Sequence, residues 1–280
     1  MVDGGSFDFE GRNVAVTGAA GTLGRATAEA FHRAGARLAL LDRDEVGLQQ
    51  VAASLHGART YALDITAPDA VAGVMERILG DLGSVDVLAN IAGGFAMGPL
   101  LQDTDDATWD RMFELNLRSV FNTCRAVVPH MLEAGFGRII NVSARAAREG
   151  KGKMGPYCAS KAGVITLTES LARENWHSPV NVNCILPGTI DTPPNRESMP
   201  DADFTTWVAP SALADVILFG SFLIWAVVDR VSFKRRVERP VPSAPVKGIN
   251  DVLVVAAGLG VYVIFVLWLH EAWFGVAPFG

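Results

Sequence analysis

Short apolar runs alternate with longer amphipathic segments over the first two thirds of the chain. Six strands are predicted from apolar runs at 14–17, 37–41, 60–63, 85–89, 138–142 and 180–186. Helices are predicted between them, near 22–34, 45–55, 68–82, 107–133 and 157–176. Strands separated by helices pair in parallel through right-handed crossovers. The pattern therefore predicts an α/β fold with a doubly wound parallel sheet, in which ligands bind beyond the carboxyl ends of the strands.

The hydrophobic pattern changes after residue 210. Residues 212–228 contain one internal charge, Asp215, and residues 252–269 contain none. As helices, these runs would each reach roughly 26–27 Å, close to the apolar core of a bilayer at about 30 Å. We therefore divide the chain into a Rossmann domain, residues 1–210, and a hydrophobic tail, residues 211–280, with two candidate transmembrane helices.

Composition and charge limit the class of partner. The chain has 280 residues, of which 50% are hydrophobic, and a formal net charge of −6. The main domain is acidic, which argues against binding to nucleic acid. Three cysteines without metal-ligand spacing predict buried free thiols and no metal site. The first residues lack the pattern of a signal segment, so we expect the main domain to stay in the cytoplasm.

A glycine-rich turn follows the first predicted strand. Gly18, Gly21 and Gly24 stand three residues apart, and Thr22 and Leu23 begin the next helix. Glycines there permit a tight turn and a close backbone approach to a pyrophosphate, and the helix N-terminus offers free N–H groups. Such a turn also occurs without a ligand. Its place between a strand and a helix favours a dinucleotide site.

Acidic and small residues follow the next strands. Asp42 ends the second strand, where a carboxylate binds ribose hydroxyls and repels a 2′-phosphate, which favours NAD over NADP. The adjacent Arg43 weakens this preference because it can pair with a phosphate. Asp64, after the third strand, is either an adenine contact or a helix cap. The fourth strand ends in small residues that suit either a backbone beside a cofactor or a plain turn, at Asn90, Ala92 and Gly93.

Tyr157 and Lys161 stand four residues apart, a spacing that puts a phenol and an ammonium on one face of a helix. A free tyrosine has a pKa near ~10, and a nearby cation lowers it by stabilising the phenolate. Such a pair can exchange a proton with an alcohol or a ketone. The alternative is an exposed helix face that carries both residues by chance.

Five motifs in collinear order together resemble the short-chain dehydrogenase/reductase family over about residues 8–219. The matching residues are Thr17-Gly18-x-x-Gly21-x-x-Gly24, Asn90-x-Ala92-Gly93, Asn116, Tyr157-x-x-x-Lys161 and Pro187 to Thr192. The resemblance implies hydride transfer between a nicotinamide cofactor and a small carbonyl or alcohol substrate. It also implies that Tyr157 exchanges the proton, that Lys161 holds the nicotinamide ribose and lowers the pKa of the tyrosine, and that Asn116 places a water.

The same resemblance implies carboxamide contacts from the end of the sixth strand, at Pro187, Gly188, Ile190 and Thr192. It leaves the catalytic serine open. In the family this serine usually lies 13 residues before the tyrosine, where this chain has Ala144, next to Ser143. Either the backbone turns so that Ser143 reaches the substrate, or the enzyme lacks the serine, as in the dihydropteridine-reductase-like branch.

The tail resembles the end of NnrU-type integral membrane proteins, through residues 213–229 and Trp268-Leu269-His270. A short-chain dehydrogenase would normally finish its sheet with a further strand, so this fusion predicts a sheet without the last strand. The basic loop at 229–250 favours the cytoplasmic side, which conflicts with a cytoplasmic domain joined by a single crossing at 212–228. Attachment to the inner membrane and packing of the tail on the domain both stay open.

Two functions follow from these observations. The first is a NAD-dependent oxidoreductase, which as a family member can form a homo-oligomer. The second is a catalytically inactive scaffold anchored to a membrane, suggested by Ala144 and by the replaced C-terminus. Four apolar residues are candidates to line the substrate pocket, with ordinary packing as the alternative for each: Phe95, Met97, Phe204 and Trp207.

Overall fold

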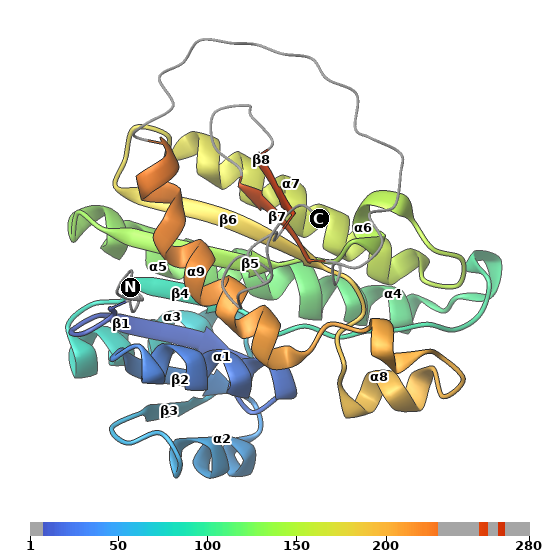
Figure 1. Ribbon diagram of the computed structural model, residues 1–280, viewed down its shortest axis with the longest axis horizontal. Helices are drawn as coiled ribbons and strands as arrows, with labels where there is room; N and C mark the ends of the chain where they lie inside the picture. Colours follow the sequence, from blue (N-terminus) through green and yellow to red (C-terminus); the bar gives the residue numbers. More distant parts are fainter. Residues whose placement is uncertain (1–7, 229–251, 257–262, 267–280) are drawn as a thin grey trace, which may run out of the picture.

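The computed structural model describes residues 8–228, 252–256 and 263–266. Within these ranges, eight strands form one sheet in the order β3-β2-β1-β4-β5-β6-β7-β8 (Figure 1). The first six strands pair in parallel. They are β1 (Asn13–Thr17), β2 (Arg37–Asp42), β3 (Arg59–Ala62), β4 (Val87–Asn90), β5 (Gly137–Val142) and β6 (Val180–Pro187). This part confirms the predicted Rossmann fold.

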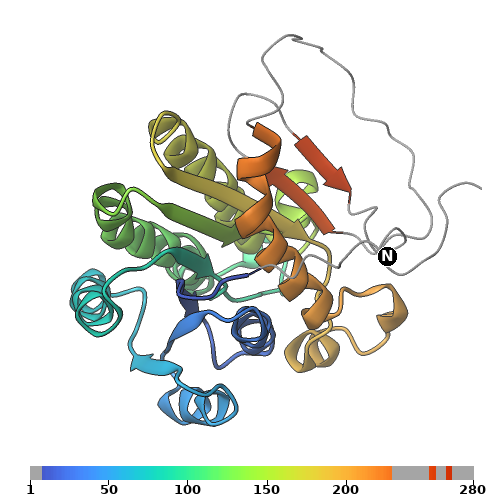
Figure 2. The same cartoon turned by 60° about the vertical axis from the view of Figure 1, so that its left-hand side comes forward.

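Helices cover both faces of the sheet (Figures 1 and 2). One face carries α1 (Thr22–Arg33), α2 (Glu45–Ala52) and α9 (Pro210–Val228), and the other carries α3 (Pro68–Leu82), α5 (Ser119–Glu133) and α7 (Gly155–Glu174). Successive residues of a strand pack on opposite faces, as Val14 and Ala15 do. Because both faces are buried, the strands are apolar throughout rather than alternating.

Three shorter α-helices are α4 (Asp106–Phe113), α6 (Ala146–Glu149) and α8 (Pro193–Ser198), and single 3-10 turns lie at Leu101–Asp103 and Phe204–Thr206. A π-helical turn at Glu114–Arg118 joins α4 to α5, so the single helix predicted at 107–133 is interrupted. Helix caps follow the local sequence. Asp44 and Asp105 each accept a backbone N–H bond at the start of α2 and of α4.

A buried polar network ties α5 and α7 to the centre of the sheet. The amide of Asn90 donates to Asn141 Oδ1 at 2.8 Å, and its oxygen accepts from Thr123 Oγ1 at 2.8 Å. Asn141 in turn donates to Thr168 Oγ1 at 2.9 Å. Each of these groups would be costly to bury alone. The network therefore fixes the register of α7, the helix that carries Tyr157, against β4 and β5.

The first apolar run of the tail forms a helix as predicted, but it packs on the sheet. Leu213, Ala214 and Ile217 of α9 are fully buried in the core. Asp215 lies 3.6 Å from Arg33 of α1 as an ion pair. Among the residues that the structure describes, no helix is long and apolar enough to cross a membrane. The prediction of a transmembrane helix at 212–228 is not confirmed, and burial in the core accounts for the apolar residues between Leu213 and Leu218.

The second apolar run is not helical where the structure describes it. β7 (Val252–Ala256) pairs antiparallel with β6, and β8 (Val263–Val266) pairs antiparallel with β7. The predictions of a helix over 252–269 and of no strand beyond β6 are therefore wrong for these residues. Both segments are rich in β-branched residues, which favour strands. The rest of this run and the basic loop at 229–250 lie outside the described residues, and the domain boundary at 210/211 stays a prediction.

Candidate active site

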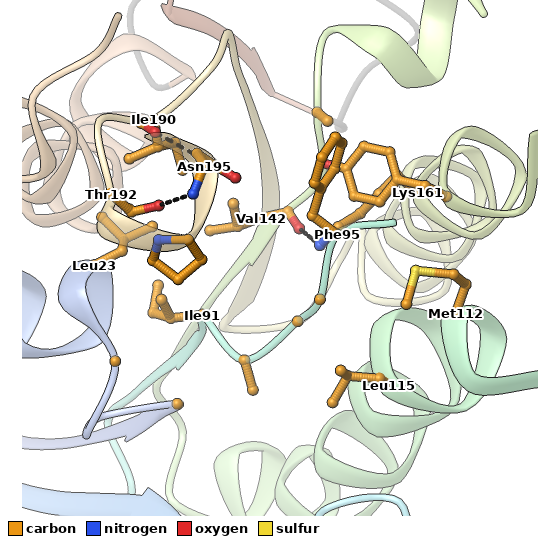
Figure 3. A pocket seen from close by; sticks show the side chains of 18 of the residues that line it. Leu23, Ile91, Phe95, Met112, Leu115, Val142, Lys161, Ile190, Thr192 and Asn195 are labelled. Carbon is orange, nitrogen blue, oxygen red and sulfur yellow. Dashed lines mark hydrogen bonds between the residues drawn. The ribbon is translucent and has the colours of Figure 1, made fainter. Parts of the chain in front are cut away.

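A cavity of about 950 Å³ lies at the carboxyl ends of the parallel strands. Its walls come from the turns after β1 to β6 and from α7 and α8 (Figure 3). Asn90 and Asn116 are not among its lining residues. The other predicted site residues line it: Gly18, Gly21, Thr22, Leu23, Gly24, Asp42, Asp64, Ala92, Gly93, Ser143, Tyr157, Lys161, Pro187, Gly188, Ile190 and Thr192.

The turn after β1 has the space and the donors that a phosphate needs. Gly18 has φ +67°, and a Cβ there would lie 2.8 Å from Ala92 Cα, so only glycine fits. The backbone at Gly24 packs directly on the Gly18 carbonyl. α1 begins without a side-chain cap at Gly21 and without an acidic residue in its first turn. Its first N–H groups are therefore available to an anion, and this donor set fits a dinucleotide pyrophosphate.

Two carboxylates line the cavity after β2 and β3. Asp42 is half-buried and accepts the Ala20 N–H at 3.0 Å, which holds the glycine turn against β2. Asp64 is exposed and accepts two hydrogen bonds from Thr66, which lower the pKa of its carboxyl group. Arg43 also lines this wall. The Asp42 carboxylate at the end of β2 is therefore followed in the cavity wall by a cation, Arg43.

Lys161 is the buried cation of the site. Its ammonium donates to the Val142 carbonyl at 2.9 Å, and the residue is 6% exposed (Figure 3). Gly93 lies directly against it, since a Cβ on Gly93 would be 3.0 Å from Lys161 Nζ. Burial lowers the pKa of Lys161 to about 8, because a charged amine loses its hydration. The amine is therefore mostly charged at pH 7.

Tyr157 lines the same cavity one helical turn before Lys161. Its ring packs edge-on against Phe95, with the ring centroids 5.1 Å apart. Burial raises the pKa of Tyr157 to about 12, and the charge of Cys158 adds a smaller rise. This direction is opposite to the lowering predicted from the sequence, because burial dominates and the Lys161 ammonium is bonded to Val142. The phenol is protonated at neutral pH, which suits a proton donor.

Ser143 is buried, and its hydroxyl donates to the Lys161 carbonyl oxygen at 2.7 Å. Its hydrogen is thereby directed at the backbone of α7. The next residue, Ala144, lines the cavity with a methyl group. Of the two alternatives that the sequence leaves open, this geometry favours a site without the usual serine.

Asn116 lies in the π-helical turn and is fully buried. Its oxygen accepts the Gly94 N–H at 2.8 Å, and its amide donates to the Gly94 carbonyl at 3.1 Å and to Ser160 Oγ at 3.1 Å. The side chain thus holds the loop after β4 against α7, beside Lys161. The water that the resemblance assigns to Asn116 stays a prediction.

Two further residues that hold the cavity walls were not identified from the sequence as site residues. Thr17 Oγ1 accepts two backbone N–H groups after β4, each at 3.1 Å. Across the cavity, Asn195 Nδ2 donates to the Ile190 carbonyl at 2.8 Å, and the Asn195 N–H donates to Thr192 Oγ1 at 3.4 Å (Figure 3). A signal for this second contact was present, because Thr192 followed by two prolines is a typical helix start.

Part of the cavity wall is apolar. Phe95 lines it, as do Met112 and Leu115, which pack against the loop after β4 (Figure 3). The other three candidates from the sequence are not lining residues. Met97 is 44% exposed, and Phe204 and Trp207 pack on each other with ring centroids 4.7 Å apart.

Comparison with known proteins gives two family matches. The model described as short chain dehydrogenase matches residues 12–203, and the NnrU protein model matches residues 207–278. The chain is 36% identical to sorbitol dehydrogenase of Cereibacter sphaeroides over 185 residues, which are 65% of this chain and 72% of that protein. It is 36% identical over 190 residues to the 3-oxoacyl-acyl-carrier-protein reductase FabG of Escherichia coli, and the match covers 68% of this chain and 78% of that protein. It is 38% identical over 186 residues to 2-keto-3-deoxy-L-fuconate dehydrogenase of Xanthomonas campestris, and the match covers 66% of this chain and 60% of that protein.

The buried Lys161 predicts a specific dependence of stability on pH. Its pKa falls from an ordinary value of 10.5 to about 8 on folding, so the unfolded chain binds the extra proton between these values. The free energy of unfolding contributed by this group therefore rises with pH across that interval, by about 3 kcal/mol. We expect the free energy of unfolding of the wild type minus that of Lys161→Met to rise by this amount, measured by denaturant unfolding at stepped pH.

Lys151→Met is the matched control for this measurement, because Lys151 is half exposed and paired with Glu149. Removal of this half-exposed charge should change the free energy of unfolding by less than about 1 kcal/mol, because a surface ion pair contributes little. A difference for Lys161→Met that does not rise with pH would mean that the Lys161 ammonium is not desolvated in the folded protein.

Proposed function

Because the chain belongs to the short-chain dehydrogenase/reductase family, we propose that it is a NAD-dependent reductase of small carbonyl compounds in which Tyr157 is the proton donor. The chain is an oxidoreductase by its family, and its relatives are named as dehydrogenases and reductases. One observation carries the finer proposal: Tyr157 and the buried Lys161 line the same cavity as the glycine turn after β1.

The reaction follows from the protonation states of the two side chains. Reduced nicotinamide, when bound, would supply a hydride to the carbonyl carbon and be left oxidised, with the electron pair of the hydride forming the new C–H bond. As the π pair of the C=O bond moves to oxygen, the Tyr157 hydroxyl gives that oxygen its proton and becomes a phenolate. The Lys161 ammonium, one turn away on α7, stabilises this phenolate. A proton from solvent restores the phenol, and the reverse reaction uses the same groups.

Two other predicted catalytic residues act by positioning in this proposal. Ser143 holds the backbone of α7 at Lys161, and Asn116 holds the loop at Gly94. Neither the Ser143 hydroxyl nor the Asn116 amide needs to touch the substrate for this role. Lys161 would also bind the nicotinamide ribose, because it lies against Gly93 at the cavity wall.

We propose NAD as the preferred cofactor. The pyrophosphate would bind at the glycine turn and the start of α1, where N–H groups are available. The Asp42 carboxylate at the end of β2 favours ribose hydroxyls over a 2′-phosphate. The remaining proposed contacts come from Asp64, Ala92, Gly93, Pro187, Gly188, Ile190 and Thr192, which all line the cavity.

Replacing the Tyr157 hydroxyl tests the proposed mechanism. We expect Tyr157→Phe to lower kcat by about 10²–10⁴-fold, the usual contribution of a positioned proton donor. The Kd for NADH should change by less than about twofold, because only the hydroxyl is removed. Carbonyl-dependent NADH oxidation and fluorescence titration measure the two quantities.

Tyr61→Phe is the matched control, since the Tyr61 hydroxyl bonds to Asp81 and does not line the cavity. It should lower the free energy of unfolding and leave kcat unchanged. Wild-type kcat in Tyr157→Phe would contradict the mechanism. Failure of the wild-type protein to bind NADH would instead favour the inactive scaffold.

The charge of Asp42 provides a separate test of cofactor choice. In Asp42→Asn the repulsion of a 2′-phosphate is removed while the side-chain shape is kept. We expect the ratio of Kd for NADPH to Kd for NADH to fall by about tenfold, which corresponds to about 1.4 kcal/mol. Asp44→Asn is the control, because Asp44 caps α2 and does not line the cavity. It removes a nearby negative charge and should leave the ratio of the two Kd values unchanged. Equal Kd values for the two cofactors in the wild type would contradict the preference for NAD.

The NnrU match at residues 207–278 supports a further proposal, that the C-terminal segment attaches the protein to the inner membrane. Alkaline carbonate washing of membranes tests it, and complete recovery of the full-length chain in the supernatant would exclude integral insertion. The homo-oligomer stays a prediction.

A further inference from the structure

The loop after β4 carries an apolar strip that begins in the cavity wall and continues onto the surface. The strip, residues 95–101, reads Phe-Ala-Met-Gly-Pro-Leu-Leu, and none of its seven residues has a polar side chain. Phe95 lines the cavity (Figure 3), whereas residues 97–101 are exposed and lie outside the lining. Leu100 is 51% exposed and Leu101 is 68% exposed. Large apolar side chains gathered on a surface commonly mark a place where an apolar ligand or partner binds.

Both ends of the strip pack on the start of α7, the helix that carries Tyr157. At the inner end, the ring of Phe95 meets the ring of Tyr157 edge-on, with centroids 5.1 Å apart. At the outer end, Leu101 lies against Gly155, where an added Cβ would be 3.2 Å from Leu101 Cδ1. A group that extends from Tyr157 past Phe95 therefore reaches the exposed part of the strip.

Backbone hydrogen bonds hold the strip in place. The Gly98 N–H donates to the Lys153 carbonyl at 3.0 Å. Lys153 has φ 62°, a left-handed conformation that residues with a side chain seldom adopt. Further along, the Leu100 carbonyl accepts the Asp103 N–H at 3.0 Å. The exposed leucines thus stand on a backbone that is bonded to the chain on either side of them.

The charged residues of the cavity lining belong to other segments of the chain. They are Asp42, Arg43 and Asp64 after β2 and β3, Arg111 and Glu114 near the end of α4, and Arg145 and Lys151 after β5. Outside the lining, Asp103 and Lys153 flank the strip. A polar substituent along residues 95–101 would lose water without gaining a side-chain hydrogen bond, which is costly. An alkyl or aryl substituent is favoured there, because apolar surface leaves water on both sides of the contact.

We infer that the substrate is a ketone, or the corresponding secondary alcohol, with an extended apolar chain that lies along residues 95–101. The inference rests on the proposed function and names the substrate class of the same site. The chain takes no part in the chemistry. The carbonyl carbon receives the hydride and the carbonyl oxygen receives the Tyr157 proton, while contact of the chain with the strip holds the carbonyl group in place for both transfers.

The experiment measures NADH oxidation by the full-length protein with the unbranched methyl ketones from 2-butanone to 2-octanone, and with dihydroxyacetone as a polar ketone. Each added methylene covers more of the strip, so we expect kcat/KM to rise by about two- to fourfold per methylene. The double variant Leu100→Ser/Leu101→Ser should lower kcat/KM for 2-octanone by about tenfold and for 2-butanone by less than about twofold.

Val46→Ser is the matched control, because Val46 is as exposed as Leu101, at 68%, and lies on α2 outside the cavity lining. It should leave the dependence on chain length unchanged. In the wild type, NADH oxidation with dihydroxyacetone or the ketones but without a rise along the series overturns the inference and leaves the proposed reductase standing. This wild-type result decides the matter even if the double variant does not fold.

Two results with the double variant would also overturn the inference. One is an equal loss of kcat/KM for 2-butanone and 2-octanone. The other is a lower molecular mass than the wild type in analytical ultracentrifugation, which would assign the strip to a contact between two copies of the chain. Absence of NADH oxidation with every carbonyl compound contradicts the proposed function itself.

Discussion

A buried ammonium at the carboxyl edge of the sheet is the constraint on which the rest of the site depends. Lys161 Nζ donates to the carbonyl of Val142 at the end of β5, and Ser143 Oγ donates back to the carbonyl of Lys161. The two bonds join the end of β5 to the first turns of α7 in both directions. They orient Lys161 toward Gly93 and place Tyr157 in the cavity. Burying the charge costs about 3 kcal/mol, so other parts of the fold must offset it.

The polar layer beneath the cavity supplies part of that support. Asn90, Thr123, Asn141 and Thr168 form a chain of hydrogen bonds between the sheet and the helices α5 and α7. The network explains why Asn90, predicted as a cofactor contact, has its side chain turned below the cavity. The side-chain nitrogen of Asn90 donates to Asn141 and its oxygen accepts from Thr123, and Asn141 continues the network to α7 through Thr168. Asn90, a residue of the motif after the fourth strand, therefore supports the site by holding α7 in place rather than by lining the cavity.

The sequence predicted the sheet and its glycine turn closely, and the limits of the prediction have physical causes. Strands buried on both faces give short apolar runs, and the six predicted strands match to within about two residues. The two transmembrane helices predicted for the tail are not confirmed, because a long apolar run fits a membrane helix, a core helix and a strand pair equally well by hydropathy. The apolar residues between 213 and 218 pack in the core, and residues 252–256 extend the sheet. The direction of the Tyr157 pKa shift was also wrong, since spacing alone gives neither burial nor the partner of Lys161.

Direct titration of Lys161 tests the central claim. With the lysine side chains labelled, the NMR chemical shift of the Lys161 ε-methylene group can be followed against pH and assigned by its absence in a Lys161 variant. A midpoint of about 8 is the result that a desolvated ammonium bonded to the Val142 carbonyl requires. A midpoint near 10.5, the ordinary value for a hydrated lysine, would contradict the account.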